Sequence, residues 1–371
     1  MRTTSFLGFG AAIALLSLAC GDSGSTFAGQ VTGDAGAGDD ASSGDGATGG
    51  DGSAGDGSTG GCGTCATGST CGSANGIAVC RSASGIPIFK SVFVIVMENA
   101  SKKTLDAATN APYLKALAQS AAIGNDYHGV AHPSLPNYVA MMSGDTQGVT
   151  CDCDPTGTAC TALTCNALLH GCGCSHAAAS IADQIEAAGK TWKAYAEGMG
   201  TPCNKTSAGQ YATRHVPFLY YDGVQSNATR CASHVVDYAA FAGDMNAPPS
   251  LAFIAPNLTN DGHDPFPANA ANLANADTWL STNAKAILES AAFKAGGLLV
   301  VVWDEDDNSG IPAADDPVPI FVMSPYAKKA YASATKADHY ALLATIEDGL
   351  GLARLGKAAQ ATPLTDYFPA K

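Results

Sequence analysis

The sequence has few basic residues and no apolar run near its N-terminus long enough to cross a membrane. Lysine and arginine number 19 against 33 aspartates and glutamates, which gives a formal net charge of −14 over 371 residues. A nucleic-acid-binding protein would carry a basic stripe, so this composition argues against nucleic acid as a partner. The apolar run at residues 6–19 has 14 residues, whereas a membrane-spanning helix needs roughly 20.

The short apolar run instead predicts a secretory signal. It ends at Cys20 in the sequence LSLAC, which resembles a bacterial lipobox, where the cysteine is lipidated and becomes the mature N-terminus. Residues 1–20 are therefore interpreted as a lipoprotein-type signal peptide with lipidation at Cys20. We expect an exported cell-envelope lipoprotein, on the periplasmic or outer face and tethered to a membrane. The alternative is an ordinary secreted protein with a free Cys20.

Residues 21–61 lack lysine and arginine and contain 15 of the 42 glycines and seven aspartates. Such a segment cannot bury enough apolar surface to offset the entropy of ordering, so a disordered Gly/Asp/Ser spacer is expected. Cys62, Cys65, Cys71 and Cys80 follow. Two disulfides that staple a small module over residues 62–85 are the preferred interpretation, and a zinc site is the alternative.

Eight more cysteines lie in the large remaining domain, residues 86–371. Six fall in an insertion at residues 145–176, and Cys203 and Cys231 follow further along the chain. The even total and the predicted export favour disulfides, and Cys203 is expected to pair with Cys231. A soft-metal site that uses His170 and His176 is the alternative.

Apolar strands alternate with alanine-rich helical stretches across residues 86–371, which predicts an α/β domain with a mostly parallel sheet. The expected strands are residues 89–97, 191–196, 251–255, 298–303 and 319–323. The expected helices are residues 114–122, 139–142, 177–188, 271–295 and 339–350. In such sheets ligands bind at the carboxyl ends of the strands.

Polar side chains follow three of these strands directly. Glu98 and Asn99 follow the strand at 89–97, residues 257–264 (NLTNDGHD) follow the strand at 251–255, and residues 304–307 (DEDD) follow the strand at 298–303. Oxygen ligands gathered at one sheet edge suit a divalent cation, although aspartate and asparagine are also common in turns and caps. Ser134 lies between two prolines in HPSLPNY. A serine is a weak nucleophile alone, and coordination to a metal would activate it.

Five blocks in this order resemble the phosphoesterase family of bacterial phospholipases C and acid phosphatases. They are VFVIVMEN, HPSLPNYVAMMSG, APNLTNDGHD, VVVWDEDDNSG and DHYALLATIED. The resemblance implies an alkaline-phosphatase-like three-layer sandwich, α/β with a mostly parallel central sheet. It also implies one divalent metal cation, with Glu98, Asn99, Ser134, Asp304 and Glu305 as its ligands. Ser134 would be the nucleophile, and the histidines near the phosphate would be His132, His215, His263 and His339. Because Asp306 and Asp307 directly follow Asp304 and Glu305 in the fourth block, which two of these four acids bind metal is left open.

The predicted function is metal-dependent hydrolysis of phosphomonoesters through a phosphoserine, as in acid phosphatases. A phospholipase C-type phosphodiesterase is the first alternative, so the expected substrate is a phosphorylated small molecule or a phospholipid. A membrane-tethered binding lipoprotein on an inactive phosphatase scaffold is the second.

Overall fold

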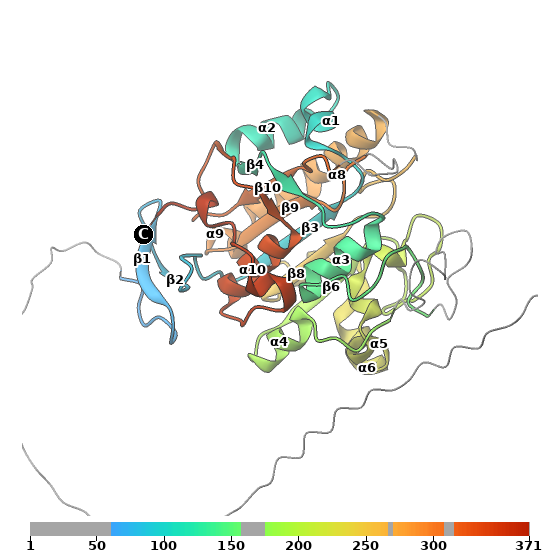
Figure 1. Cartoon of the computed structure of the whole chain (residues 1–371), viewed down its shortest axis with the longest axis horizontal. Coiled ribbons are helices and arrows are strands. Elements are labelled where there is room, and N and C mark those ends of the chain that lie inside the picture. The colour runs from blue at the N-terminus through green and yellow to red at the C-terminus, as the bar shows by residue number, and fades with distance from the viewer. Residues whose placement is uncertain (1–60, 157–174, 266–269, 308–314, 371) are drawn as a thin grey trace, which may run out of the picture. The chain divides into compact units, whose positions relative to one another are not determined.

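The computed structural model describes residues 61–156, 175–265, 270–307 and 315–370 (Figure 1). The predicted signal peptide with Cys20, the spacer up to residue 60 and residues 157–174 of the insertion lie outside the described residues. No helix within these ranges is long and apolar enough to span a membrane.

An eight-stranded sheet forms the centre of the domain, with the order β11-β4-β10-β9-β3-β8-β6-β7. Of these eight described strands, β10 alone runs antiparallel to its neighbours. The strands are β3 (Val92–Met97), β4 (Ala122–Gly124), β6 (Trp192–Ala196), β7 (Val235–Asp237), β8 (Leu251–Ala255), β9 (Leu298–Trp303), β10 (Ile320–Met323) and β11 (Tyr331–Ser333). Two short strands outside it, β5 (Tyr127–His128) and β12 (Ala337–Asp338), pair with each other.

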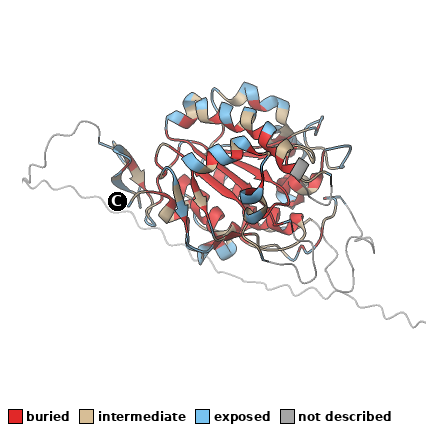
Figure 2. Ribbon diagram, turned by 90° about the horizontal axis from the view of Figure 1, so that it is seen from above, coloured by how far each residue is buried: buried red, intermediate tan, exposed pale blue. Residues whose placement is uncertain are grey.

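Helices cover both faces of the sheet (Figure 2). Every residue of β3, β8 and β9 is accordingly buried. Residues that point to alternate faces of a strand are all buried only when both faces are covered. Two helix pairs lie in these layers: α2 (Pro112–Ser120) packs with α8 (Ala270–Glu289), and α3 (Ser134–Ser143) packs with α10 (His339–Leu350). The other helices are α1 (Lys102–Ala107), α4 (Ile181–Ala187), α5 (Asp222–Gln225), α6 (Ala228–His234), α7 (Phe241–Asp244) and α9 (Ala291–Lys294).

The α/β fold expected from the strand–helix alternation is confirmed, with local differences. The helix expected over residues 271–295 is interrupted at Ser290, whose side chain accepts a hydrogen bond from the N–H of Phe293 and so begins α9. The strands β4, β7 and β11 were not expected; each has only three residues, too few for an alternating apolar pattern to be recognised.

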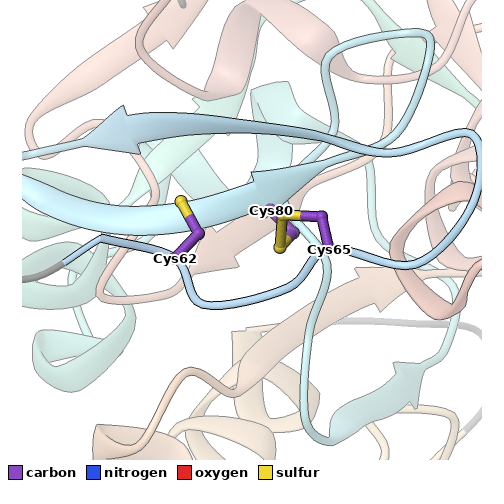
Figure 3. Close-up of side chains that lie close together, drawn as sticks. All are labelled: Cys62, Cys65 and Cys80. Carbon is purple, nitrogen blue, oxygen red and sulfur yellow. A yellow bond between two sulfur atoms is a disulfide. The ribbon is translucent and has the colours of Figure 1, made fainter. Parts of the chain in front are cut away.

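The cysteine module is a disulfide-bonded hairpin of β1 (Thr70–Ala74) and β2 (Ile77–Arg81). Cys62 pairs with Cys71, and Cys65 pairs with Cys80; the second bond is drawn in Figure 3. The sulfurs of Cys62, Cys65 and Cys80 lie within 4.8 Å of one another, but all three are oxidised to disulfides. Because a disulfide sulfur is no thiolate ligand, the zinc alternative is wrong.

The hairpin packs against the domain through hydrogen bonds. The Asn75 side chain donates to the carbonyl oxygens of Pro325 and Ala327 at 2.9 and 2.7 Å. The hydroxyl of Ser84 donates to Asp348 at the end of α10. The module is thus held to the segment that follows β10 and to the last turn of α10.

Disulfides also occur in the large domain. Cys203 pairs with Cys231, as expected from the sequence. Cys151 and Cys153 are both disulfide-bonded, while the other four cysteines of the insertion lie outside the described residues.

Candidate active site

The acids that follow β3 and β9 meet at the carboxyl edge of the sheet. These strands are parallel neighbours and Met97 is paired with Trp303, so Glu98 and Asp304 leave the sheet side by side. The N–H of Asp304 donates to the carbonyl of Met97 at 3.0 Å, and the N–H of Asn99 lies 3.4 Å from Asp304 Oδ1. Asn99 has a φ of 52°, a left-handed conformation that asparagine tolerates better than most residues.

Ser134 is the first residue of α3, and its hydroxyl points at these acids. Ser134 Oγ lies 2.9 Å from Glu98 Oε2 and 3.2 Å from Glu305 Oε1. The helix is buried along all of its ten residues, which fixes the direction of its first side chain. The N-terminus of a helix also carries partial positive charge and free N–H groups, an environment that favours a phosphate-like anion.

Tyr138 and His215 form a second layer around Glu98. The Tyr138 hydroxyl donates to Glu98 Oε1 at 2.5 Å, and the Tyr138 ring stacks on His215 with centroids 5.2 Å apart. His215 Nε2 lies 3.2 Å from Glu98 Oε1, and His215 Nδ1 lies 3.1 Å from Asp261 Oδ2. Burial, followed by the charges of Arg214 and His263, lowers the pKa of His215. A buried imidazole therefore lies between two carboxyl groups.

Arg214 and His263 lie next to this layer. An Arg214 amino group is 3.0 Å from His263 Nε2, and Arg214 Nε is 3.5 Å from Asp152 Oδ2. Asp152 also accepts the N–H of Leu135, the second residue of α3, at 3.0 Å. Asp152 therefore connects the N-terminus of the Ser134 helix to the arginine.

His132 lies on the open side of the site. Its Nδ1 is 2.7 Å from Glu305 Oε2, and its side chain is 29% exposed. Hydrogen bonding to Glu305 raises the pKa of His132. The ring lines a cavity of about 210 Å³ together with Glu305, Asp306 and Asp315. His132 is therefore the histidine of this site that a ligand in that cavity reaches directly.

His339, expected near the phosphate, lies against the backbone of Asp304. Its Nε2 contacts the backbone oxygen of Asp304 at 2.6 Å, and its Nδ1 contacts the hydroxyl of Tyr127 at 2.9 Å. His339 is fully buried, and both ring nitrogens are engaged by the protein. Its place is that of a positioning residue, which fixes the turn after β9.

The four acids after β9 divide into two pairs. Glu305 accepts a hydrogen bond from Ser134, and Asp304 also interacts with the Ser134 side chain. Asp306 accepts the N–H of Asp316 at 2.9 Å, and Asp307 accepts the N–H of Ser101 at 3.3 Å. The second pair therefore holds neighbouring loops, and Asp306 Oδ1 also lies 3.8 Å from His132 Nε2 at the cavity.

The site gathers more negative charge than a buried environment tolerates. Burial is the largest cause that raises the pKa of each of four carboxyl groups, and mutual repulsion adds to it for Glu98 and Asp304; the four are Glu98, Asp261, Asp304 and Glu305. Oδ2 of Asp304 is buried, and no hydrogen bond from a described residue reaches it. Buried charges of one sign need a counter-ion, and oxygen donors suit a hard divalent cation.

The donor chemistry of Glu98, Asn99, Ser134, Asp304 and Glu305 thus fits the cation expected from the sequence. The oxygen atoms of the acids among them are not all within 4.8 Å of one another. Within the described ranges, the cysteine module supplies the only group of three acid, histidine or cysteine ligands with atoms within 4.8 Å of one another.

Residues 103–353 match the model of the phosphoesterase family. The chain belongs to the phosphoesterase family. The match begins just after Asn99 and covers Ser134 and the acids after β9. As a phosphoesterase, the protein is a hydrolase that acts on phosphoric esters.

Curated relatives of this phosphoesterase carry phosphatase names. Over 293 residues it is 30% identical to the phosphatidylinositol-3-phosphatase of Mycobacterium tuberculosis, covering 77% of this chain and 85% of the relative. Over 279 residues it is 28% identical to a probable acid phosphatase of Kluyveromyces lactis, covering 72% of this chain and 60% of the yeast protein. A solved structure from Vibrio parahaemolyticus, described as a protein in the alkaline phosphatase superfamily, aligns with a TM-score of 0.52 at 10% identity. That alignment covers 78% of this chain and 72% of the other. The fold expected from the resemblance is thereby confirmed.

Three residues of the phosphoesterase site were missed from the sequence. Tyr138 is four residues after Ser134, on the same helix face, so its proximity could have been inferred. Asp261 lies in the block NLTNDGHD among the polar residues at a strand end, where nothing separates it from its neighbours. Asp152 sits in the cysteine-rich insertion, and no local pattern indicates that it reaches α3.

Proposed function

We propose that this phosphoesterase is a metal-dependent phosphomonoesterase that uses Ser134 as its nucleophile. The observation that carries the proposal is the position of Ser134 Oγ, 2.9 Å from Glu98 and 3.2 Å from Glu305 at a helix N-terminus. When bound, a divalent cation would supply charge neutralisation and would lower the pKa of the hydroxyl. Glu98, Asn99, Ser134, Asp304 and Glu305 are the residues that would hold it.

The protein groups then have separate roles. Ser134 Oγ forms a bond to phosphorus while the bond to the leaving oxygen breaks, which gives a phosphoserine; the hydroxyl proton passes toward the carboxylate that accepts its hydrogen bond. His132, partly exposed and with a pKa that Glu305 raises, donates a proton to the leaving oxygen. Arg214 and His263 bind the equatorial phosphoryl oxygens. Water releases phosphate in the second step.

The natural substrate follows from the relatives only as a class. One relative is named for a phosphoinositide and others for acid phosphatase activity, so a phosphorylated small molecule or a phospholipid headgroup is proposed. A phospholipase C-type phosphodiesterase is the second candidate. Lipidation at Cys20, which would place the enzyme in the cell envelope, is part of the same proposal.

A substrate panel tests the proposal. p-Nitrophenyl phosphate, a short-chain phosphatidylinositol 3-phosphate, bis-p-nitrophenyl phosphate and phosphatidylcholine would be assayed with and without EDTA across pH 4–9. We expect hydrolysis of the monoesters, loss with EDTA and recovery with a divalent cation. Hydrolysis of the diesters alone would favour the phospholipase C alternative. Hydrolysis of none of the four would favour a binding lipoprotein.

Ser134→Ala tests the nucleophile in the same assay. In a separate measurement, rapid acid quench of the wild-type enzyme should trap phosphate on Ser134. We expect the variant to fold normally and to lose at least 100-fold in kcat. Activity above a few per cent of the wild type would rule out Ser134.

A further inference from the structure

A second cavity lies at the opposite edge of the sheet from Ser134. Its volume is about 430 Å³, and it is bounded by the end of α2, by α8 and α9, and by the segment after β10. Met323, which lines it, is paired with Leu299 near the start of β9. Asp304, in contrast, follows the end of β9. The two sites are therefore separated by the length of that strand.

The lining of this cavity combines apolar side chains with lysines. The apolar part comes from Leu117, Leu288, Phe293, Val322 and Met323, and the lysines are Lys294, Lys328 and Lys329. None of the described residues that line the cavity is an aspartate or a glutamate, although acids outnumber bases 33 to 19 in the whole chain. The cavity is thus a local positive region on an acidic protein.

The lysines are available to a ligand. None of the three forms an ion pair with a carboxylate in the part of the chain that the structure describes. Lys294 Nζ donates to the backbone oxygen of Glu289 at 2.6 Å, and Lys328 Nζ lies 4.0 Å above the ring of Tyr331. These contacts hold the two side chains in place but supply neither with a carboxylate partner.

The rim that carries Lys328 and Lys329 is already held in its conformation. The N–H of Lys328 donates to the carbonyl of Tyr367 at 2.9 Å, and the N–H of Tyr331 donates to the carbonyl of Ala121 at 3.2 Å. Asn75 of the cysteine module binds two carbonyls of the same segment. A preorganised rim lowers the entropy cost of binding a ligand.

We propose that this cavity binds a single-chain anionic lipid. The acyl chain would lie on the apolar floor, where its burial is favourable by about 0.8 kcal/mol per CH₂. The carboxylate or phosphate headgroup would contact Lys294, Lys328 and Lys329. Ligand pockets of about 300–1,000 Å³ with an apolar lining and a few convergent polar groups are typical of small-molecule sites. The site is independent of Ser134 and does not require the proposed catalytic function.

Isothermal titration calorimetry with dodecanoate, kept below its micelle concentration, tests this proposal. Acetate presents the headgroup without the chain, and dodecyltrimethylammonium presents the chain with the opposite charge. We expect one dodecanoate site per chain, and at least tenfold weaker binding of both control ligands. Raising the salt concentration should weaken dodecanoate binding, because the headgroup contact is electrostatic.

The variant Lys294→Glu/Lys329→Glu reverses the charge of two exposed lysines, and we expect it to weaken dodecanoate binding at least tenfold. Lys103→Glu/Lys190→Glu is the matched control, since neither residue lines the cavity, and its affinity should equal that of the wild type. Ser120→Trp, which places a large ring at the cavity wall, should also reduce binding. Unchanged affinity in both cavity variants, or equal affinity for dodecyltrimethylammonium, would overturn the proposal. Hydrolysis of p-nitrophenyl phosphate, measured in parallel, should stay at the wild-type rate in all of them.

Discussion

Tyr138 donates a hydrogen bond of 2.5 Å to Glu98 Oε1, while the other oxygen of Glu98 accepts the hydroxyl of Ser134. Glu98 is fully buried, so both of its oxygens depend on protein donors for their direction. Tyr138 and Ser134 are one helical turn apart on α3. The helix therefore presents the nucleophile and the orienting phenol to the same carboxylate.

Tyr138→Phe should lower kcat about tenfold or more while the protein stays folded. The change removes one donor to a buried carboxylate, a loss of about 1–3 kcal/mol, but keeps the ring that stacks on His215. Tyr221→Phe is the matched control, because the Tyr221 hydroxyl donates to the carbonyl of Val139 on the same helix at 2.9 Å. Steady-state kinetics and thermal unfolding would be measured for both. Equal kcat in the two variants would remove Tyr138 from the site.

Substitution of Asp304 should lower activity far more than substitution of Asp306, although the two residues are only two positions apart. Asp304→Asn removes a charge beside Ser134 and should lower kcat at least 100-fold and reduce bound metal, measured by mass spectrometry of the purified protein. Asp306→Asn keeps an oxygen that can accept the N–H of Asp316, so its kcat should stay within a few-fold of the wild type. A reversed order of effects would show that the second acid pair binds the cation.

The strand ends of this site were predictable, whereas its second layer was not. β3 and β9 are continuous runs of apolar residues, and polar residues follow each directly, so Glu98 and Asp304 could be placed at one edge of the sheet from the sequence alone. Whether the two residues are neighbours depends on the order of the strands in the sheet, which the spacing of apolar residues along the sequence does not predict. The expected role of His339 came from a resemblance, and its contact with the Asp304 backbone comes from its place as the first residue of α10, directly after β12.

The contact between Tyr138 and His215 joins segments with no shared local pattern, since His215 lies in the short 3-10 helix Thr213–His215. Asp152 is a similar case. It lies between two cysteines that are both disulfide-bonded, and it accepts the N–H of Leu135 at the N-terminus of α3. Composition alone indicated only that the insertion contains disulfides.

Removing the Cys203–Cys231 disulfide should affect both stability and substrate binding. The bond closes a loop with a sequence separation of 28 that contains Arg214 and His215, and disulfides of this kind contribute about 2–4 kcal/mol. Cys203→Ala/Cys231→Ala should therefore lower Tm and raise KM at least threefold, as Arg214 loses its support.

The control for this prediction is Cys62→Ala/Cys71→Ala in the cysteine module, where the sequence separation is 9. This variant should leave KM unchanged, because the module contacts the segment after β10 and the end of α10. A rise in KM of the same size in both variants would mean that the effect is global destabilisation.

Glu347 should make the folded protein less stable as pH rises toward neutrality. This residue of α10 is fully buried, and burial raises its pKa to about 8 from an ordinary 4.5. One carboxyl oxygen accepts the N–H of Leu355 at 2.8 Å, while the other has no hydrogen-bond partner among the described residues. The protonated acid is therefore the form that the fold prefers, and its contribution is complete below about pH 4.5.

Between pH 4.5 and 8 the unfolded chain releases this proton while the native state keeps it, so the free energy of unfolding should fall by about 1.4 kcal/mol per pH unit from this group. Glu347→Gln keeps the shape and an acceptor for Leu355 without the charge. Urea denaturation at pH 4.5, 6 and 8 should show that the stability difference between variant and wild type grows in favour of glutamine as pH rises. A difference that is constant over this range would mean that Glu347 is ionised at its ordinary pKa.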